Sequence, residues 1–490
     1  MPALVEMAKL KLYRMQYDSA FYFAHKALRI DTYDGAANYY YGKAASHLSK
    51  KYDALDGFEV ASLTPQFRNA AYTSLSHEYM KHREFVKAED YALLSLKSNS
   101  ENVDALQVLY ILSRLKNDQK MLDEVRQKLE KLNPLNHFLS FEDYFQSPSD
   151  ENKNKFTDLI QNEMPVETFL ELAIWYANLG FYDEGREVLE LAPQNTETLY
   201  WLAWLHRDGN ASLSKEYLSK ASASSPGYVF PFREETAKVL EWAADKDASW
   251  HSDYLLALIE DYRGNREDAL ERMISYDEAI PFAPFYLLRA RLYDQSSLAL
   301  KLQDVDKAIS IDQDEWRYGR IKSGILVQMK KQEEALQVLK DYYKADKDNY
   351  IIGLDLVRLL IRSNEYTDAE KILATLHVLP FEGATDARRY YRETKLMLAH
   401  MAMEKGNYKQ ALSKIVESEE WPSRLGVGKP YPEDINNGLE NFMRSLIHKK
   451  SGKNDVPRND EDKIANSEIN ENNYLDRIKS ITSRTDQRMF

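Results

Sequence analysis

A short pattern that recurs about every 34 residues constrains the fold of this chain more than any other feature. A bulky, often aromatic residue is followed two or three places later by alanine or glycine, with an amphipathic helical stretch on either side. Self-similarity at this period is typical of stacked helical repeats. The copies of the pattern begin at Tyr17, Tyr52, Phe85, Tyr182, Arg266, Gln332, Tyr366 and Tyr408.

The physical interpretation of this pattern is a helical hairpin whose second helix begins at the bulky residue. The bulky side chain fills the space between the paired helices, and the small residue lets their backbones approach. A Gly or Asn ahead of it supplies the left-handed turn that ends the first helix, and a Pro after the second helix stops it. Single hairpins cannot cover their own apolar faces, so they stack. The pattern resembles the tetratricopeptide repeat, and it predicts an all-α, right-handed α-solenoid of tetratricopeptide-type hairpins.

Breaks in the pattern divide the chain into four expected parts. A first repeat block covers 1–136, and a degenerate helical connection covers 137–165, where several aromatic residues precede a polar run. A second repeat block covers 166–448. The tail, 449–490, is polar and has few side chains to bury, so we expect it to be disordered apart from a short basic helix near its end.

Charge and missing motifs exclude several functional classes. The chain has 65 Lys and Arg against 78 Asp and Glu, and a net charge of −13 disfavours nucleic-acid binding; basic residues among the last seventeen leave an RNA-binding array as a third alternative. Without cysteine there is no disulfide, thiolate zinc site or cysteine nucleophile. HExxH, GxSxG and GxGxxG motifs are absent, and no apolar run approaches the ~18–20 residues of a membrane span. We expect no enzyme, cofactor, metal or membrane partner.

Two motifs that resemble known ligand sites fit them poorly. Leu425 to Tyr431 is glycine-rich, but Pro430 stands where a phosphate loop needs Ser or Thr. The pattern predicts an ordered loop between helices. Its residues Arg424, Lys429 and Tyr431 are a candidate surface for a partner. The clamp by which some tetratricopeptide repeats hold a carboxylate is matched incompletely, because Val5 and Tyr39 occupy positions that should be polar, although Lys9, Asn38 and Lys43 are suitable.

Aromatic residues in the expected loops and first helices are the remaining candidates for partner binding. In the plainer interpretation these rings plug the ends of the core. In the functional interpretation they line one edge of the solenoid, because aromatic and Arg side chains are the usual anchors of interfaces. Tyrosines on first helices would line the concave side and could form an amphipathic groove for a peptide or a sugar. The candidates are Tyr39, Tyr40, Phe230, Phe232, Arg233 and Phe381.

Five segments carry a further resemblance, and they lie at 30–42, 170–176, 228–233, 283–287 and 425–431. These segments are similar to one group of large bacterial proteins, which join an N-terminal β-rich domain of unknown function to a tetratricopeptide array. That domain is thought to be related to the galactose-mutarotase superfamily. The resemblance implies that the β-rich domain is missing from this chain and that the repeats serve as its arm. No catalytic residue is carried over.

These observations lead to one expected function and one alternative. We expect a non-catalytic protein–protein interaction scaffold that binds a peptide or a partner domain along a concave tetratricopeptide surface. The alternative is the repeat arm of a carbohydrate-binding or carbohydrate-active protein. No export signal is visible at Met1, so we expect a cytoplasmic location, although the chain could also be a fragment whose own N-terminus is not shown.

Overall fold

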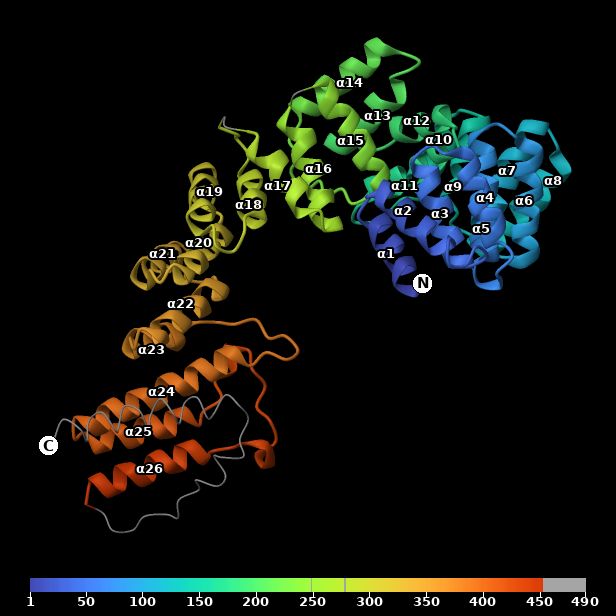
Figure 1. The fold of residues 1–490 in the computed structure, drawn as a ribbon. Helices are drawn as coiled ribbons and strands as arrows, with labels where there is room; N and C mark the ends of the chain where they lie inside the picture. The colour runs from blue at the N-terminus through green and yellow to red at the C-terminus, as the bar shows by residue number, and fades with distance from the viewer. Residues whose placement is uncertain (248, 277–278, 453–490) are drawn as a thin grey trace. The chain divides into compact units, whose positions relative to one another are not determined.

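The computed structural model describes residues 1–247, 249–276 and 279–452, and it confirms the all-α fold class (Figure 1). The described residues form α-helices and two short 3-10 helices, with no strand among them. The chain separates into two compact units, unit 1 (Met1–Glu278) and unit 2 (Ala279–Phe490). Of the tail predicted at 449–490, residues 449 and 450 belong to a helix, whereas 453–490, with the predicted basic helix, lie outside the described residues.

Unit 1 contains seventeen described helices, most of them paired into antiparallel hairpins. In chain order they are α1 (Pro2–Tyr13), α2 (Tyr17–Leu28), α3 (Gly35–His47), α4 (Lys51–Ala61), α5 (Pro65–Lys81), α6 (Phe85–Ser98), α7 (Val103–Lys116), α8 (Gln119–Leu132), α9 (His137–Gln146), α10 (Asp150–Thr157), α11 (Pro165–Asn178), α12 (Tyr182–Glu190), α13 (Thr196–His206), α14 (Ala211–Ala223), α15 (Glu234–Lys246), α16 (Trp250–Arg263) and α17 (Arg266–Ile274).

Unit 2 continues the same architecture through its described residues. Its helices are α18 (Ala283–Leu292), α19 (Leu298–Ile311), α20 (Trp316–Gln328), α21 (Gln332–Ala345), α22 (Tyr350–Arg362), α23 (Tyr366–Thr375), α24 (Asp386–Glu404), α25 (Tyr408–Ser418), η1 (Ser423–Leu425), η2 (Pro432–Asp434) and α26 (Gly438–Lys450).

The small residue of the repeat pattern lies where the two helices of a hairpin approach most closely. In α12 the same position is Gly185, and a Cβ added there would lie 2.9 Å from the carbonyl oxygen of Ala173 in α11. Any larger side chain would push the helices apart, so the sequence interpretation of the small residue is confirmed. The alanines at this position are completely buried, and they are Ala20, Ala54, Ala88, Ala269, Ala335, Ala369 and Ala411.

The turns between paired helices use the left-handed conformation at more positions than the sequence pattern predicts. Gly180 and Gly264 adopt positive φ angles of 78° and 82°, as expected for residues that end a helix. The equivalent turns at Met15, Ser49, Arg83 and Lys330 also have φ between 58° and 62°, although these residues carry a Cβ. Packing of the paired helices imposes this turn even where the local sequence disfavours it. The residues concerned therefore carry backbone strain.

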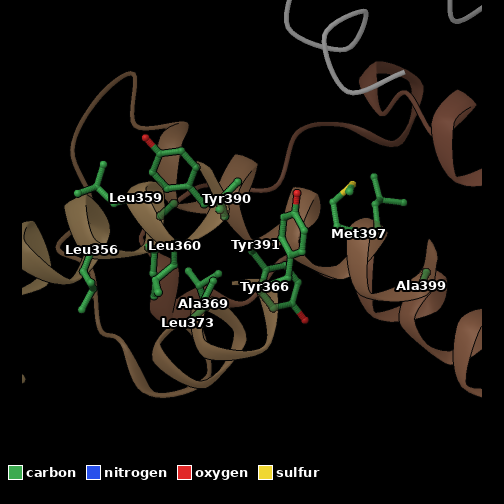
Figure 2. Packing of buried hydrophobic residues seen from close by; sticks show 14 of the residues in the cluster. Leu356, Leu359, Leu360, Tyr366, Ala369, Leu373, Tyr390, Tyr391, Met397 and Ala399 are labelled. Carbon is green, nitrogen blue, oxygen red and sulfur yellow. The ribbon is translucent and has the colours of Figure 1, made fainter. Parts of the chain in front are cut away.

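Aromatic and aliphatic side chains from consecutive hairpins share one core in unit 2. Figure 2 shows Leu356, Leu359 and Leu360 of α22 facing Tyr366, Ala369 and Leu373 of α23, with Tyr390 and Tyr391 of α24 closing the cluster. Each hairpin thus covers the apolar face that its neighbour leaves open, as stacked repeats require.

One helix of unit 1 departs from the alternation of first and second helices. The hairpin α13–α14 is followed by α15, and α16 then pairs with α17 to form the next hairpin with the repeat pattern. Helix α15 therefore stands between two hairpins as an additional element. Its position determines which surfaces of unit 1 remain open.

Candidate partner-binding surfaces

Helix α15 lies against helices from the opposite end of unit 1. At its first residue, the Glu234 carboxylate accepts a hydrogen bond of 3.0 Å from the hydroxyl of Tyr17, which begins α2. One turn later, the ammonium group of Lys238 lies 3.1 Å from Nδ1 of His47, the last residue of α3. These contacts join residues 217 and 191 positions apart. Helix α15 therefore lies beside the start of α2 and the end of α3.

The same helix is held from a second side by α11. The amide of Asn178, at the end of α11, donates to the carboxylate of Glu235 at 3.0 Å. Arg233, which precedes α15, forms an ion pair with Glu167 in the first turn of α11. Helices α2, α3 and α11 thus all contact the first turns of α15, and its position does not depend on one contact alone.

A buried carboxylic acid fixes α15 to the neighbouring helix α13. The hydroxyl of Thr236 in α15 donates to Glu197 at 2.9 Å, and the same hydroxyl accepts a hydrogen bond of 3.0 Å from the indole of Trp201. Glu197 is 1% exposed. Burial, followed by the nearby carboxylate of Glu167, raises the pKa of Glu197 to about 7. This group is therefore protonated in part near neutral pH.

His47 is neutral in this arrangement. Burial, and then the positive charge of Lys238, lowers its pKa to about 2. Its ring stacks on Tyr17 with 4.3 Å between the ring centroids. An ammonium group can only donate, so Nδ1 accepts from Lys238, and the hydrogen lies on Nε2, which faces Glu234 at 3.4 Å. The contact between His47 and Glu234 is therefore not an ion pair.

The turn between α1 and α2 contacts the turn between α16 and α17, and we call this contact the seam. The side-chain amide of Asn265 donates to the carbonyl oxygen of Arg14 at 2.6 Å and accepts from Gln16 at 3.2 Å. Arg263 donates to the carbonyl oxygen of Tyr13 at 3.3 Å. The partners lie 249 to 251 positions apart in the chain. The two ends of unit 1 are thus joined through backbone groups.

Exposed aromatic rings gather around the seam. Tyr13 and Phe232 each lie 6.5 Å from Tyr262, measured between ring centroids, and the guanidinium of Arg263 lies 5.1 Å from the centroid of Tyr13. The three rings remain 40–59% exposed. We call these four residues the seam patch. Arg263 also donates to the carbonyl oxygen of Phe232 at 2.8 Å, which fixes the backbone beneath the rings.

Of the residues predicted for partner binding, one belongs to the seam patch and another lies beside it. Phe232 belongs to it, and Arg233 stacks against Phe232 at 4.4 Å while pairing with α11. Phe230 is exposed two residues earlier. The prediction missed Tyr13 and Tyr262, because each ring ends a first helix and looks like an ordinary repeat position when taken alone.

Tyr39 and Tyr40 take part in packing between hairpins. Tyr39 lies 5.4 Å from Phe67 and 5.9 Å from Phe58, and Tyr40 lies 6.4 Å from Phe67, measured between ring centroids. Both side chains are half-buried. Burial raises the pKa of the Tyr40 hydroxyl. Their partner-binding role stays a prediction, and the seam patch does not include them.

The other predicted residues lie on two loops of unit 2 that touch each other. The guanidinium of Arg424 donates to the carbonyl oxygen of Leu373 at 3.0 and 3.3 Å, so this residue holds the loop. Gly426 has φ of 65°, and a Cβ there would lie 2.6 Å from the carbonyl oxygen of Val378. This close approach explains why glycine stands at this position, and no bound phosphate is needed to explain it. Phe381, Lys429 and Tyr431 are exposed on the same loops.

Neither a membrane-spanning helix nor a group of metal-ligating side chains occurs among the described residues. None of their helices is long and apolar enough to cross a membrane. Within the same residues, no three His, Asp or Glu side chains lie close enough together to hold a metal ion.

Comparison with known proteins assigns one segment of this chain to a protein family. No curated protein matches the sequence. Among solved structures, yeast Tom70 is 13% identical with a TM-score of 0.26, and the alignment covers 85% of this chain and 95% of Tom70. The structure of Naa15/Naa10 bound to HypK-THB gives 14% identity and a TM-score of 0.26, with coverage of 100% and 97%.

A tetratricopeptide repeat protein from Parabacteroides merdae gives 13% identity and a TM-score of 0.26, with coverage of 58% and 98%. Identities and TM-scores are low in all three, so no property of these proteins transfers to this chain. The match of residues 326–377 to the tetratricopeptide repeat family is local and spans α21 to α23. This chain therefore contains a tetratricopeptide repeat region.

Proposed function

We propose that this chain is a non-catalytic protein-interaction scaffold and that a partner protein docks apolar side chains on the seam patch. The observation that supports this most is the exposure of three rings beside an arginine on a backbone held by hydrogen bonds. Aromatic and Arg side chains dominate the energetics of interfaces. A surface that is already ordered loses little conformational entropy when it binds.

The covered ends of α2, α3 and α11 support the same choice of surface. Since α15 already contacts these helix ends, a peptide bound there would have to displace Glu234, Glu235 and Lys238 from their partners. The seam patch is exposed without such a rearrangement. Phe381, Lys429 and Tyr431 of unit 2 remain a second proposed contact surface, because nothing covers them among the described residues.

The test compares two variants of the full chain in affinity capture followed by mass spectrometry and titration of each recovered partner. Phe232→Ala combined with Tyr262→Ala removes two anchors of the seam patch, and we expect affinity for the partner to fall about 100-fold or more. Tyr52→Ala removes a ring of α4 that is even more exposed, and it serves as the control. Far-UV circular dichroism confirms that both variants fold. Equal affinity of both variants for every partner contradicts the assignment to the seam patch.

The carbohydrate alternative rests on the resemblance of the five sequence segments and on the tyrosines expected along first helices. In that proposal the chain is the repeat arm of a protein whose other domain handles sugars. A glycan array with the same chain distinguishes the two: specific glycan retention without any protein partner favours the alternative.

A further inference from the structure

One arginine of unit 2 is buried without a counter-charge. Arg388 lies in the first turn of α24 and is 7% exposed. Its Nη2 donates to the carbonyl oxygen of Ser418 at 2.7 Å, but Nε and Nη1 are buried and have no hydrogen-bond partner among the described residues. Arg289, which is equally buried, instead forms two hydrogen bonds with Asp304 at 2.7 and 2.8 Å.

The surroundings of Arg388 supply further positive potential, and the described residues supply no acceptor for its Nε or Nη1. Arg392 lies one turn along α24, and Glu440, the acid nearest in its electrostatic effect, is already paired with Arg392 at 2.6 and 2.7 Å. The positive end of the α24 dipole lies at this same turn. Burial, and then Arg392, lowers the pKa of Arg388 to about 10, so the guanidinium still carries its charge at neutral pH.

A second orphan donor lies beside it. The guanidinium of Arg388 stacks over the ring of Trp421, 4.5 Å from the ring centroid, and the indole Nε1 of Trp421 is also buried without a partner in the described residues. Unpaired buried donors are rare and costly, and an unpaired buried charge costs more. All the unsatisfied atoms named here are donors, so a ligand that satisfies them must be an acceptor. Net positive charge favours an anion over a water molecule.

We propose that Arg388 and Trp421 form a binding site for a small inorganic anion of chloride size, between the first turn of α24 and the end of α25. Because Arg388 is 7% exposed, we choose the smallest common anion, chloride, as the ligand. The anion accepts hydrogen bonds from the guanidinium, balances its charge and thereby stabilises the packing of α24 against α25. This site is independent of the seam patch, so its failure leaves the proposed function untouched.

The experiment measures thermal unfolding of the full chain in sodium chloride and in sodium gluconate at equal ionic strength. We expect the unfolding temperature to be about 5 °C higher in chloride than in gluconate. This shift applies when the chloride concentration is near one hundred times the dissociation constant. Line broadening of the ³⁵Cl nuclear magnetic resonance signal detects the bound ion directly. Arg388→Gln should lose both effects, whereas Arg362→Gln, at an exposed position of α22, should keep them.

Two further outcomes decide cases in which Arg388→Gln does not fold. Arg388→Lys keeps the charge with fewer donors, so it should retain a chloride-dependent shift that needs at least about 10-fold more chloride. Trp421→Phe keeps the ring and removes Nε1, and it should weaken chloride binding with a smaller change in unfolding temperature. Equal unfolding temperatures of the natural chain in chloride and gluconate would overturn the proposal, as would an unchanged chloride effect in Arg388→Gln.

Discussion

Replacing Glu197 with glutamine tests how the buried acid between α13 and α15 controls stability. Glutamine retains an oxygen that accepts from Thr236 and removes the titrating proton. The pKa of Glu197 is about 7 in the folded chain, against the ordinary value of 4.5 for an unperturbed glutamate. Because the folded chain holds the proton more tightly, the stability contributed by this proton is fully present below pH 4.5 and is lost as the pH rises through 7.

The magnitude follows from the two pKa values. One pKa unit corresponds to about 1.4 kcal/mol, so ionisation of Glu197 costs about 0.8 kcal/mol at pH 5 and about 3.3 kcal/mol at pH 8. We therefore expect the free energy of unfolding of Glu197→Gln, relative to the natural chain, to increase by about 2.5 kcal/mol between pH 5 and pH 8. Burial is the main cause of the shift, so solvent screening does not reduce it substantially.

Urea unfolding followed by far-UV circular dichroism at pH 5, 6, 7 and 8 measures this difference. Glu260 also has a pKa raised to about 7, mainly by burial, so the pH dependence of the natural chain should decrease in the variant without disappearing. Glu171→Gln, at an exposed position of α11, is the matched control and should follow the natural chain at every pH. The reasoning is refuted if Glu197→Gln and the natural chain show the same pH dependence.

Two further predictions concern the hairpins. Ala369→Leu places a larger side chain where α22 and α23 approach closely, and it should lower the free energy of unfolding by about 1–3 kcal/mol or more. The control Ala374→Leu, at an exposed position of the same helix, should change the free energy of unfolding little. Urea unfolding measures both variants, and equal effects would contradict the close approach. Lys330→Gly removes the strain of a positive φ of 62°. The variant should have a higher unfolding temperature, which corresponds to a gain of about 1 kcal/mol in the free energy of unfolding. Lys344→Gly, inside α21, should lower it, and a loss of stability in both refutes the strain.

The hairpins were predictable because their determinants are local. Tyr366 and Ala369 stand three residues apart, and that spacing alone places both on the packed face of one helix. Turn geometry was predictable in part: Gly180 and Gly264 signal the left-handed turn, whereas Lys330 adopts it only because the paired helices require it. A pattern of residue types cannot reveal strain that packing imposes.

The surfaces were less predictable because their residues are remote in sequence. Phe232 was identified from its loop, but its neighbours Tyr13 and Tyr262 lie 219 positions before it and 30 after it, and no local pattern links them. The contacts of α15 could not be predicted for the same reason. Its partners are remote in sequence, and the sequence of α15 does not indicate which hairpins it contacts. Arg388 escaped notice for a different reason: an arginine in an amphipathic helix suggests an exposed charge until its burial is known.

The seam and α15 change what a repeat array can do in unit 1. In open arrays each repeat contacts only its neighbours, so repeats can unravel from one end and can be gained or lost singly. In unit 1 the contacts of Asn265 and Glu234 span more than two hundred residues, and their loop entropy must be overcome before they form. Fraying of the first hairpin should therefore loosen the last, which favours all-or-none folding. Insertion of one hairpin would misalign the joined turns, so the repeat number of this unit is fixed.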